Sequence, residues 1–144
     1  MSANPITIRS LGPEDAEVLD RVRDGVFDAT IDPAALWAFL ATRVNELVVA
    51  LDRGEVIGFA YGTVLMRPDK PKEFLVNRIG VHAEYRKQGI GRRLMDRLQL
   101  SAVDRGCEAV WVLVDDRHPE ARGFYRALNG HEMPGVSLYD WDLT

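Results

Sequence analysis

The sequence has little of what several classes of protein require. It contains one cysteine, Cys107, so it can form neither an internal disulfide nor a cysteine metal cage. It has no run of 18 apolar residues that could cross a membrane, and no secretory signal is visible at its start. Basic residues (18) are fewer than acidic ones (22), and the net charge of −4 argues against a nucleic-acid partner. We therefore expect a cytoplasmic protein with no metal, no nucleic acid and no membrane among its partners.

What is present fits one globular domain over residues 1–144, because 47% of the residues are hydrophobic and 28% are charged. Runs of β-branched residues predict strands, and apolar residues spaced by three or four predict helices. The expected strands cover residues 6–9, 47–51, 56–66, 74–81, 109–114 and 137–143; the expected helices cover 14–26, 90–105, 119–128 and a short segment that begins at Pro33. The strand at 109–114 is nearly all apolar, so we expect it to be buried on both faces. This order of elements predicts an α/β fold with a central mixed sheet flanked by about four helices.

The most informative stretch is a glycine turn between a strand and the strongest predicted helix. Gly89 and Gly91 stand where that helix begins, and helix starts carry unpaired N–H groups that bind anions. The cations around the turn are Arg86, Lys87, Arg92 and Arg93, which favours a polyphosphate ligand. The alternative is that the glycines only permit a tight turn and the charges are solvated. Neither a Walker A loop nor a dinucleotide fingerprint is present, because no Gly-Lys-Ser/Thr and no third glycine follow.

Two blocks of the sequence resemble a known family. Arg86-x-x-Gly89-x-Gly91, with its lead-in at 81–86, is similar to the (Gln/Arg)-x-x-Gly-x-(Gly/Ala) motif of the GCN5-related N-acetyltransferase (GNAT) superfamily. Residues 121–130 resemble the second block of that family, and the order of elements agrees along nearly the whole chain. The resemblance implies the GNAT fold and direct transfer of acetyl from acetyl-CoA to an amine, without a covalent enzyme intermediate. Cys107 is then expected to be an inert core thiol.

The resemblance also implies which residues hold acetyl-CoA. Backbone N–H groups of residues 87–91 would bind its pyrophosphate, and the strand at 79–81 would pair with its pantetheine arm and polarise the thioester. The candidate cofactor-binding residues are Ile79, Gly80, Val81, Arg86, Lys87, Gln88, Gly89, Ile90, Gly91 and Arg92. Tyr125 matches the family tyrosine that protonates the departing thiolate, although a core position on its helix is the alternative. His118 stands where the family often has Asn, and we expect it to face solvent.

The expected acceptor side is acidic. Alternation over residues 137–143 would place two aspartates on one strand face and Tyr139, Trp141 and Leu143 on the core face. The candidate acceptor-binding residues are Asp115, Asp116, Asp140 and Asp142. Asp142 is also a candidate catalytic residue beside Tyr125, since an attacking amine must lose a proton. The alternative is ordinary charge on a solvated edge strand; its free edge would also suit a homodimer.

Within the superfamily, residues 124–143 and the opening Leu11-Gly12-Pro13 are most similar to aminoglycoside 3-N-acetyltransferases of type I. That implies a small-molecule amine as acceptor, a cationic aminoglycoside, and a role in antibiotic resistance. Arg78 departs from this subgroup, which has Asp there, and a cation would repel a polycation or favour an acceptor with a carboxylate. The alternatives are acetylation of another small amine, an amino acid or a peptide N-terminus, and a non-catalytic acyl-CoA-binding module, which the presence of Tyr125 disfavours.

Overall fold

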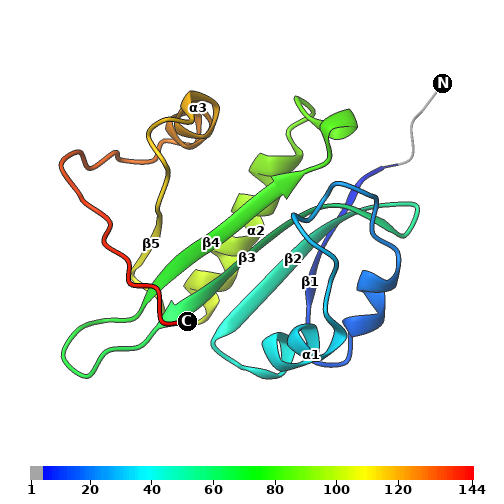
Figure 1. Cartoon of the computed structure of the whole chain (residues 1–144), viewed down its shortest axis with the longest axis horizontal. Helices are drawn as coiled ribbons and strands as arrows, with labels where there is room; N and C mark the ends of the chain where they lie inside the picture. The colour runs from blue at the N-terminus through cyan, green and yellow to red at the C-terminus, as the bar shows by residue number, and fades with distance from the viewer. Residues whose placement is uncertain (1–4) are drawn as a thin grey trace. The chain divides into compact units, whose positions relative to one another are not determined.

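The computed structural model describes residues 5–144, which pack into two compact units that divide between Leu113 and Val114. The first unit is built on a five-stranded sheet whose strands follow one another in chain order (Figure 1). The strands are β1 (Thr7–Leu11), β2 (Asn45–Asp52), β3 (Glu55–Leu65), β4 (Glu73–Val81) and β5 (Ala109–Val112). The first four pair antiparallel, and β5 pairs parallel to β4. The α/β class and the mixed sheet expected from the sequence are therefore confirmed.

Helices cover both faces of this sheet (Figure 1). The α-helices of the described chain are α1 (Pro33–Ala41), α2 (Ile90–Asp104) and, in the second unit, α3 (Pro119–Ala127); two short 3-10 helices are η1 (Ala16–Asp20) and η2 (Ala83–Tyr85). α1 begins where expected because the Asp32 carboxylate accepts a hydrogen bond from the Ala34 N–H (3.1 Å) and Pro33 takes the first position. No helix among residues 5–144 is long and apolar enough to cross a membrane.

The core of the first unit lies on the two faces of the sheet. On one face, the fully buried side chains of α2 include Leu94 and Leu98. On the other face, η1 and α1 pack on a cluster that includes Leu19, Leu40 and Phe59. Successive residues of β2 alternate between these faces, so both sides of the strand are buried.

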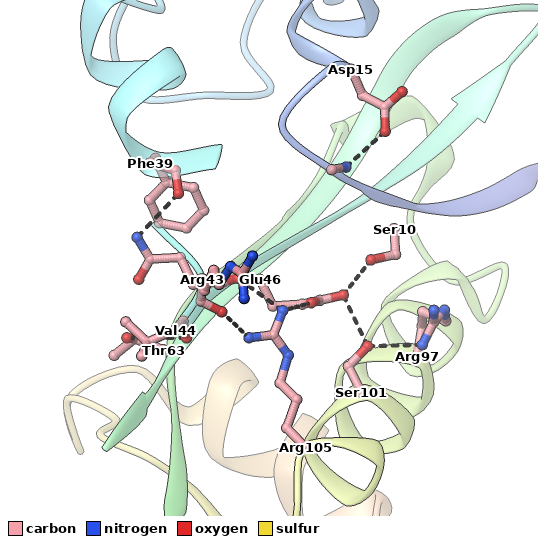
Figure 2. A network of polar contacts seen from close by, with 12 residues as sticks. Ser10, Asp15, Phe39, Arg43, Val44, Glu46, Thr63, Arg97, Ser101 and Arg105 are labelled. Atoms are coloured by element: carbon pink, nitrogen blue, oxygen red, sulfur yellow. Dashed lines mark hydrogen bonds and ion pairs between the residues drawn. The ribbon is translucent and has the colours of Figure 1, made fainter. Parts of the chain in front are cut away.

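A buried carboxylate ties α2 to the sheet. Glu46 of β2 is 6% exposed, and its carboxylate accepts hydrogen bonds from the hydroxyls of Ser10 in β1 and Ser101 in α2 (2.9 Å for Ser101). Arg105, just after α2, forms an ion pair with it at 2.7 Å and also donates to backbone carbonyls of residues 43 and 45. Figure 2 shows the Glu46 carboxylate between these three side chains. Three elements are thus joined around one charge.

One extra residue in β4 changes which face its side chains occupy. β4 pairs with β3 as Tyr61 with Arg78 and Gly62 with Val76, so Asn77 has no partner and forms a β-bulge. Because strand residues alternate between faces, Phe74 and Val76 lie on the α2 face whereas Arg78 lies on the η1 and α1 face.

Two expectations about elements of the first unit are wrong. The helix predicted over 14–26 is only the short η1, because the chain leaves the helix to form a bridge between Val22 and Val56 and Gly25 adopts φ +88°. β5 is not buried on both faces: Ala109 and Trp111, which share one face, are exposed, and Val110 and Val112 on the other face are half-buried.

The strand predicted over 137–143 is absent from the second unit. These residues form no ladder, and the side chains of Tyr139, Trp141 and Leu143, expected in the core, are 77%, 78% and 93% exposed. Alternation alone does not make a strand, because its N–H and C=O groups need a neighbouring strand. The strand edge that suggested a homodimer is therefore not formed there.

Candidate functional site

The turn before α2 is exposed and sharply curved. Gly89 is the N-cap of α2 with φ +79°, and Lys87 also has positive φ (+63°), so the chain curls sharply before the helix. The hydrogen bond from the Arg93 N–H to the Gly89 carbonyl (3.1 Å) closes the first turn of α2, and the N–H groups of Ile90 and Gly91 precede it at the start of the helix. Residues 86–89 are exposed, whereas Ile90 is buried and anchors the turn. Such a turn has the geometry of an anion site.

The side chains of this turn add positive charge. Arg86 Nε donates to the Val81 carbonyl (3.2 Å), which holds its guanidinium at the end of β4. Arg93 donates to the Ile6 carbonyl (2.8 Å) and so also fixes α2 to the residue that precedes β1. The four cations named from the sequence all lie in an exposed part of the chain. The turn is therefore basic in a chain whose net charge is −4.

A polar network holds η2, which leads into the turn. The Tyr85 hydroxyl donates to the Asp52 carboxylate in β2, and this hydrogen bond is the main cause that raises the Tyr85 pKa. Arg23 lies over the Tyr85 ring (5.3 Å to its centroid) and forms ion pairs with Glu55 (2.9 Å) and Glu84 (3.1 Å). The turn is thus attached to the β2–β3 hairpin. Sequence reasoning missed this network, since nothing in the spacing relates Arg23 to Tyr85.

The C-terminal half of β4 has an open edge. The β4–β5 ladder ends at Val76 and Val112, so in the first unit residues 78–81 pair with β3 on one side and with no strand on the other. Gly80 is needed here, because an added Cβ would lie 2.8 Å from Cε1 of Phe59. An extended edge that no strand of the first unit covers therefore runs toward the basic turn.

Beside this edge, Arg78 lies on the η1 and α1 face. Its guanidinium forms an ion pair with Asp28 (2.9 Å) and lies over the Phe59 ring (5.4 Å to the centroid). Phe27 stacks on the same ring at 4.1 Å between centroids. The segment that contains Phe27 and Asp28 therefore borders β4. The sequence drew attention to Arg78 but gave no sign that Asp28 is its partner.

The second unit carries the other predicted site residues. Tyr125 is half-buried in α3, and burial raises the pKa of its phenol. Arg117 holds the pKa of Asp115 well below its usual range through hydrogen bonds and an ion pair of 2.6 Å. Asp142 accepts hydrogen bonds from the N–H and hydroxyl of Thr144, which lower its pKa. His118 is exposed, as expected.

The structure brings one group of predicted residues together. Residues 79–81 and 86–92 meet where β4 ends and α2 begins, joined by η2. Residues 115, 116, 125, 140 and 142 belong to the second unit, and their approach to this group stays a prediction. No cluster of three or more His, Cys, Asp or Glu side chains that could hold a metal occurs in residues 5–144.

Comparison with known proteins identifies the family. The acetyltransferase (GNAT) family matches residues 17–130. The chain therefore belongs to the GNAT family of acetyltransferases.

The chain matches parts of two curated relatives. The chain is 35% identical over 96 residues to the N-alpha-acetyltransferase RimI of Mycobacterium tuberculosis, a match that covers 65% of the chain. The chain spans 60% of the length of that relative and 36% of a second curated relative from Mycobacterium leprae.

Solved structures share the fold at lower identity. An aminoglycoside acetyltransferase, meta-AAC0020 from an uncultured soil metagenomic sample, in complex with sisomicin, has a TM-score of 0.85 at 22% identity and covers 96% of this chain and 97% of its own. The aminoglycoside N-acetyltransferase AAC(6')-Iy in complex with CoA has a TM-score of 0.78 at 19% identity, with 95% of each chain covered. These likenesses confirm the GNAT fold expected from the sequence.

Proposed function

We propose that the protein is an acetyl-CoA-dependent N-acetyltransferase that transfers acetyl directly to a primary amine. One observation carries the proposal: the open edge of β4 leads into a basic, exposed turn at the start of α2. An extended edge suits the amide-bearing arm of CoA, and a helix start suits its phosphates. Family membership supports the same chemistry.

The donor would lie along residues 79–81 and 86–92. Backbone N–H groups at 87–91 bind the pyrophosphate, with Arg92 nearby, and an N–H of the 79–81 strand polarises the thioester carbonyl. Most of these contacts come from the main chain. The donor site therefore depends on backbone conformation at Gly80 and Gly89 more than on particular side chains.

The transfer itself forms one bond and breaks another. The neutral amine nitrogen attacks the thioester carbon, the C–N bond forms, and the C–S bond breaks with its electron pair on sulfur. Tyr125 gives its proton to the departing thiolate; the raised pKa supports this role because the phenol is protonated at neutral pH. The attacking nitrogen then carries one proton too many and transfers it to a base, for which Asp142 is the candidate. Burial raises the pKa of the Cys107 thiol, which argues against a covalent enzyme intermediate.

The first acceptor class is an aminoglycoside, at its 3-amino group. The likeness of residues 124–143 to type I 3-N-acetyltransferases supports this class. The exposed aspartates of the second unit also support it; they are Asp115, Asp116, Asp140 and Asp142. The sisomicin complex of a protein with the same fold is consistent with this class. Carboxylates attract such a polycation by Coulomb steering.

The second acceptor class is an α-amine, either of an amino acid or of a peptide N-terminus. The 35% identity to RimI over 96 residues supports it. So does Arg78, a cation beside the open edge of β4 where a polycation would be repelled.

A thiol-release assay with acetyl-CoA tests both classes. The acceptors are gentamicin, kanamycin, amino acids and a peptide with a free N-terminus. We expect turnover with at least one class and a melting temperature that rises on addition of acetyl-CoA. Acetyl-CoA binding without turnover on any amine would support the non-catalytic acyl-CoA-binding module instead, and absence of binding would contradict the donor site.

A further inference from the structure

Arg78 reaches its position through the β-bulge at Asn77. With regular alternation, residue 78 would share the α2 face with Phe74 and Val76, and its charge would lie against the apolar core. The extra residue directs Arg78 to the opposite face, beside Phe59 and Asp28. Bulges beside functional sites commonly redirect a side chain in this way.

An acceptor that reaches the end of β4 meets this face. The α2 face is closed there, because a Cβ on Gly58, which pairs with Val81, would already lie 3.4 Å from the Leu94 side chain. The open edge of residues 78–81 is the place proposed for the donor arm. Within the first unit, an acceptor can therefore reach the end of β4 only from the face that carries Arg78. The charge of residue 78 then acts on every acceptor that approaches from this face.

The present partner of Arg78 is weakly held. Asp28 is 81% exposed and lies in a segment without regular secondary structure, whereas the Arg78 side chain is 38% exposed. Exposed ion pairs contribute little, so another carboxylate can replace Asp28. A guanidinium has five N–H donors in a planar fork that binds a carboxylate through two hydrogen bonds, and this one lies over the Phe59 ring, with 5.4 Å between Cζ and the ring centroid.

We propose that Arg78 selects the acceptor by binding a carboxylate that accompanies the reactive amine, with Asp28 in that place until the acceptor arrives. The substrate class is then a small amine that carries a carboxylate, such as an amino acid, rather than a polycation. This inference rests on the proposed acetyltransferase function and chooses between its acceptor classes.

The test uses acceptors that differ by one carboxylate: alanine against ethylamine, and lysine against 1,5-diaminopentane. We expect kcat/KM of the full-length protein to be roughly ten- to a hundredfold higher for the carboxylated member of each pair. Arg78→Gln should remove that ratio, mainly through KM, and Arg78→Lys should restore part of it. Asp28→Asn should lower KM for alanine, because it removes the competing carboxylate.

Arg9→Gln is the matched control. Arg9 is also a strand arginine in an ion pair, with Asp15 at 2.8 Å, and its side chain is 46% exposed, but it lies on β1, away from the open edge of β4. The ratio should not change in this variant.

Binding of the product gives a readout that does not need turnover. N-acetylalanine keeps the carboxylate and N-ethylacetamide lacks it, so calorimetry on the CoA-loaded protein should detect the first and not the second, with loss of binding in Arg78→Gln. An equal ratio in the wild type and Arg78→Gln, a preference for the diamine or gentamicin, or no binding of N-acetylalanine would overturn the inference and leave the acetyltransferase proposal intact. Failure to bind CoA would instead overturn the proposed function.

Discussion

Gly89 is the residue on which the donor turn depends most. Its φ of +79° is a conformation that other residues adopt with strain, yet nothing lies within 4 Å of an added Cβ. Gly89→Ala should therefore cost about 1 kcal/mol of stability through the backbone alone. The strain falls on the turn proposed to hold the donor, so we also expect weaker CoA binding by calorimetry.

Gly25→Ala is the control for this variant. Gly25 also has positive φ (+88°) and open space around it, but it lies in the segment after η1. Both variants should lose similar stability, and only Gly89→Ala should lose affinity for CoA. Equal affinity in the two variants would show that the turn does not hold the donor.

Tyr125 carries the proposed proton transfer. Tyr125→Phe removes the phenolic proton and should lower kcat about 10²- to 10⁴-fold while CoA affinity is kept. Because burial raises the pKa of this phenol above its ordinary value near 10, the protonated form persists through neutral pH. Wild-type activity should thus show no loss from Tyr125 below pH 10. An unchanged kcat in Tyr125→Phe would assign the residue to packing in α3.

Among the elements, η2 is held by the hydrogen bond from Tyr85 to Asp52. That bond raises the Tyr85 pKa, so the folded state binds the proton more tightly than the unfolded state. Its contribution is complete below the unfolded pKa near 10 and is lost as pH rises through the higher folded pKa. Tyr85→Phe should lower stability at pH 8 and flatten its decline above pH 10 in denaturant titrations. Tyr139→Phe, an exposed tyrosine, is the control and should change neither.

α2 depends on the buried carboxylate of Glu46. Glu46→Ala would leave Arg105 without its ion pair and two hydroxyls without their acceptor. We expect a loss of about 3 kcal/mol in the free energy of unfolding. This value is at the lower end of the range for breaking a buried ion pair, because the Arg105 side chain is 31% exposed. Urea melts would measure it, with Glu17→Ala, an exposed position of η1, as the control. A loss no larger than in the control would contradict the role of the network.

Elements were predictable from sequence where local pattern and packing agree. α2 has apolar residues every four positions and Gly106 at its end, and the structure buries that stripe and gives Gly106 a φ of +80°. The bulge at Asn77 was not predictable, because a bulge arises from the register between two strands. The η1 helix ended early for a similar reason, since Val22 pairs with a distant strand.

In the candidate site too, the sequence predicted only the features whose residues are close together along the chain. The turn at 86–91 was found because its glycines and cations are adjacent in the sequence. The partners of Arg78 and Tyr85 are 50 and 33 positions away along the chain, and sequence spacing gives no sign of them.

At the scale of the whole molecule, charge is unevenly distributed. The chain carries a net charge of −4, yet residues 86–93 include four cations. CoA affinity should therefore fall as salt rises from 50 to 500 mM, because screening weakens the attraction between phosphates and this turn. S-acetyl-N-acetylcysteamine, a thioester without phosphates, is the control and should bind equally at both salt concentrations. The same salt dependence for both ligands would place the phosphates away from the turn.

The open edge of β4 also bears on how such a protein can change under selection. Main-chain groups at 79–81 keep their positions under most substitutions. The side chain of residue 78 instead contacts Asp28, so it can change without loss of the donor contacts. Mutations that recruit a new acceptor would thus accumulate at residue 78 and along 27–28, without a loss of the acetyl donor. Donor use and acceptor choice would then evolve as separate traits of one domain.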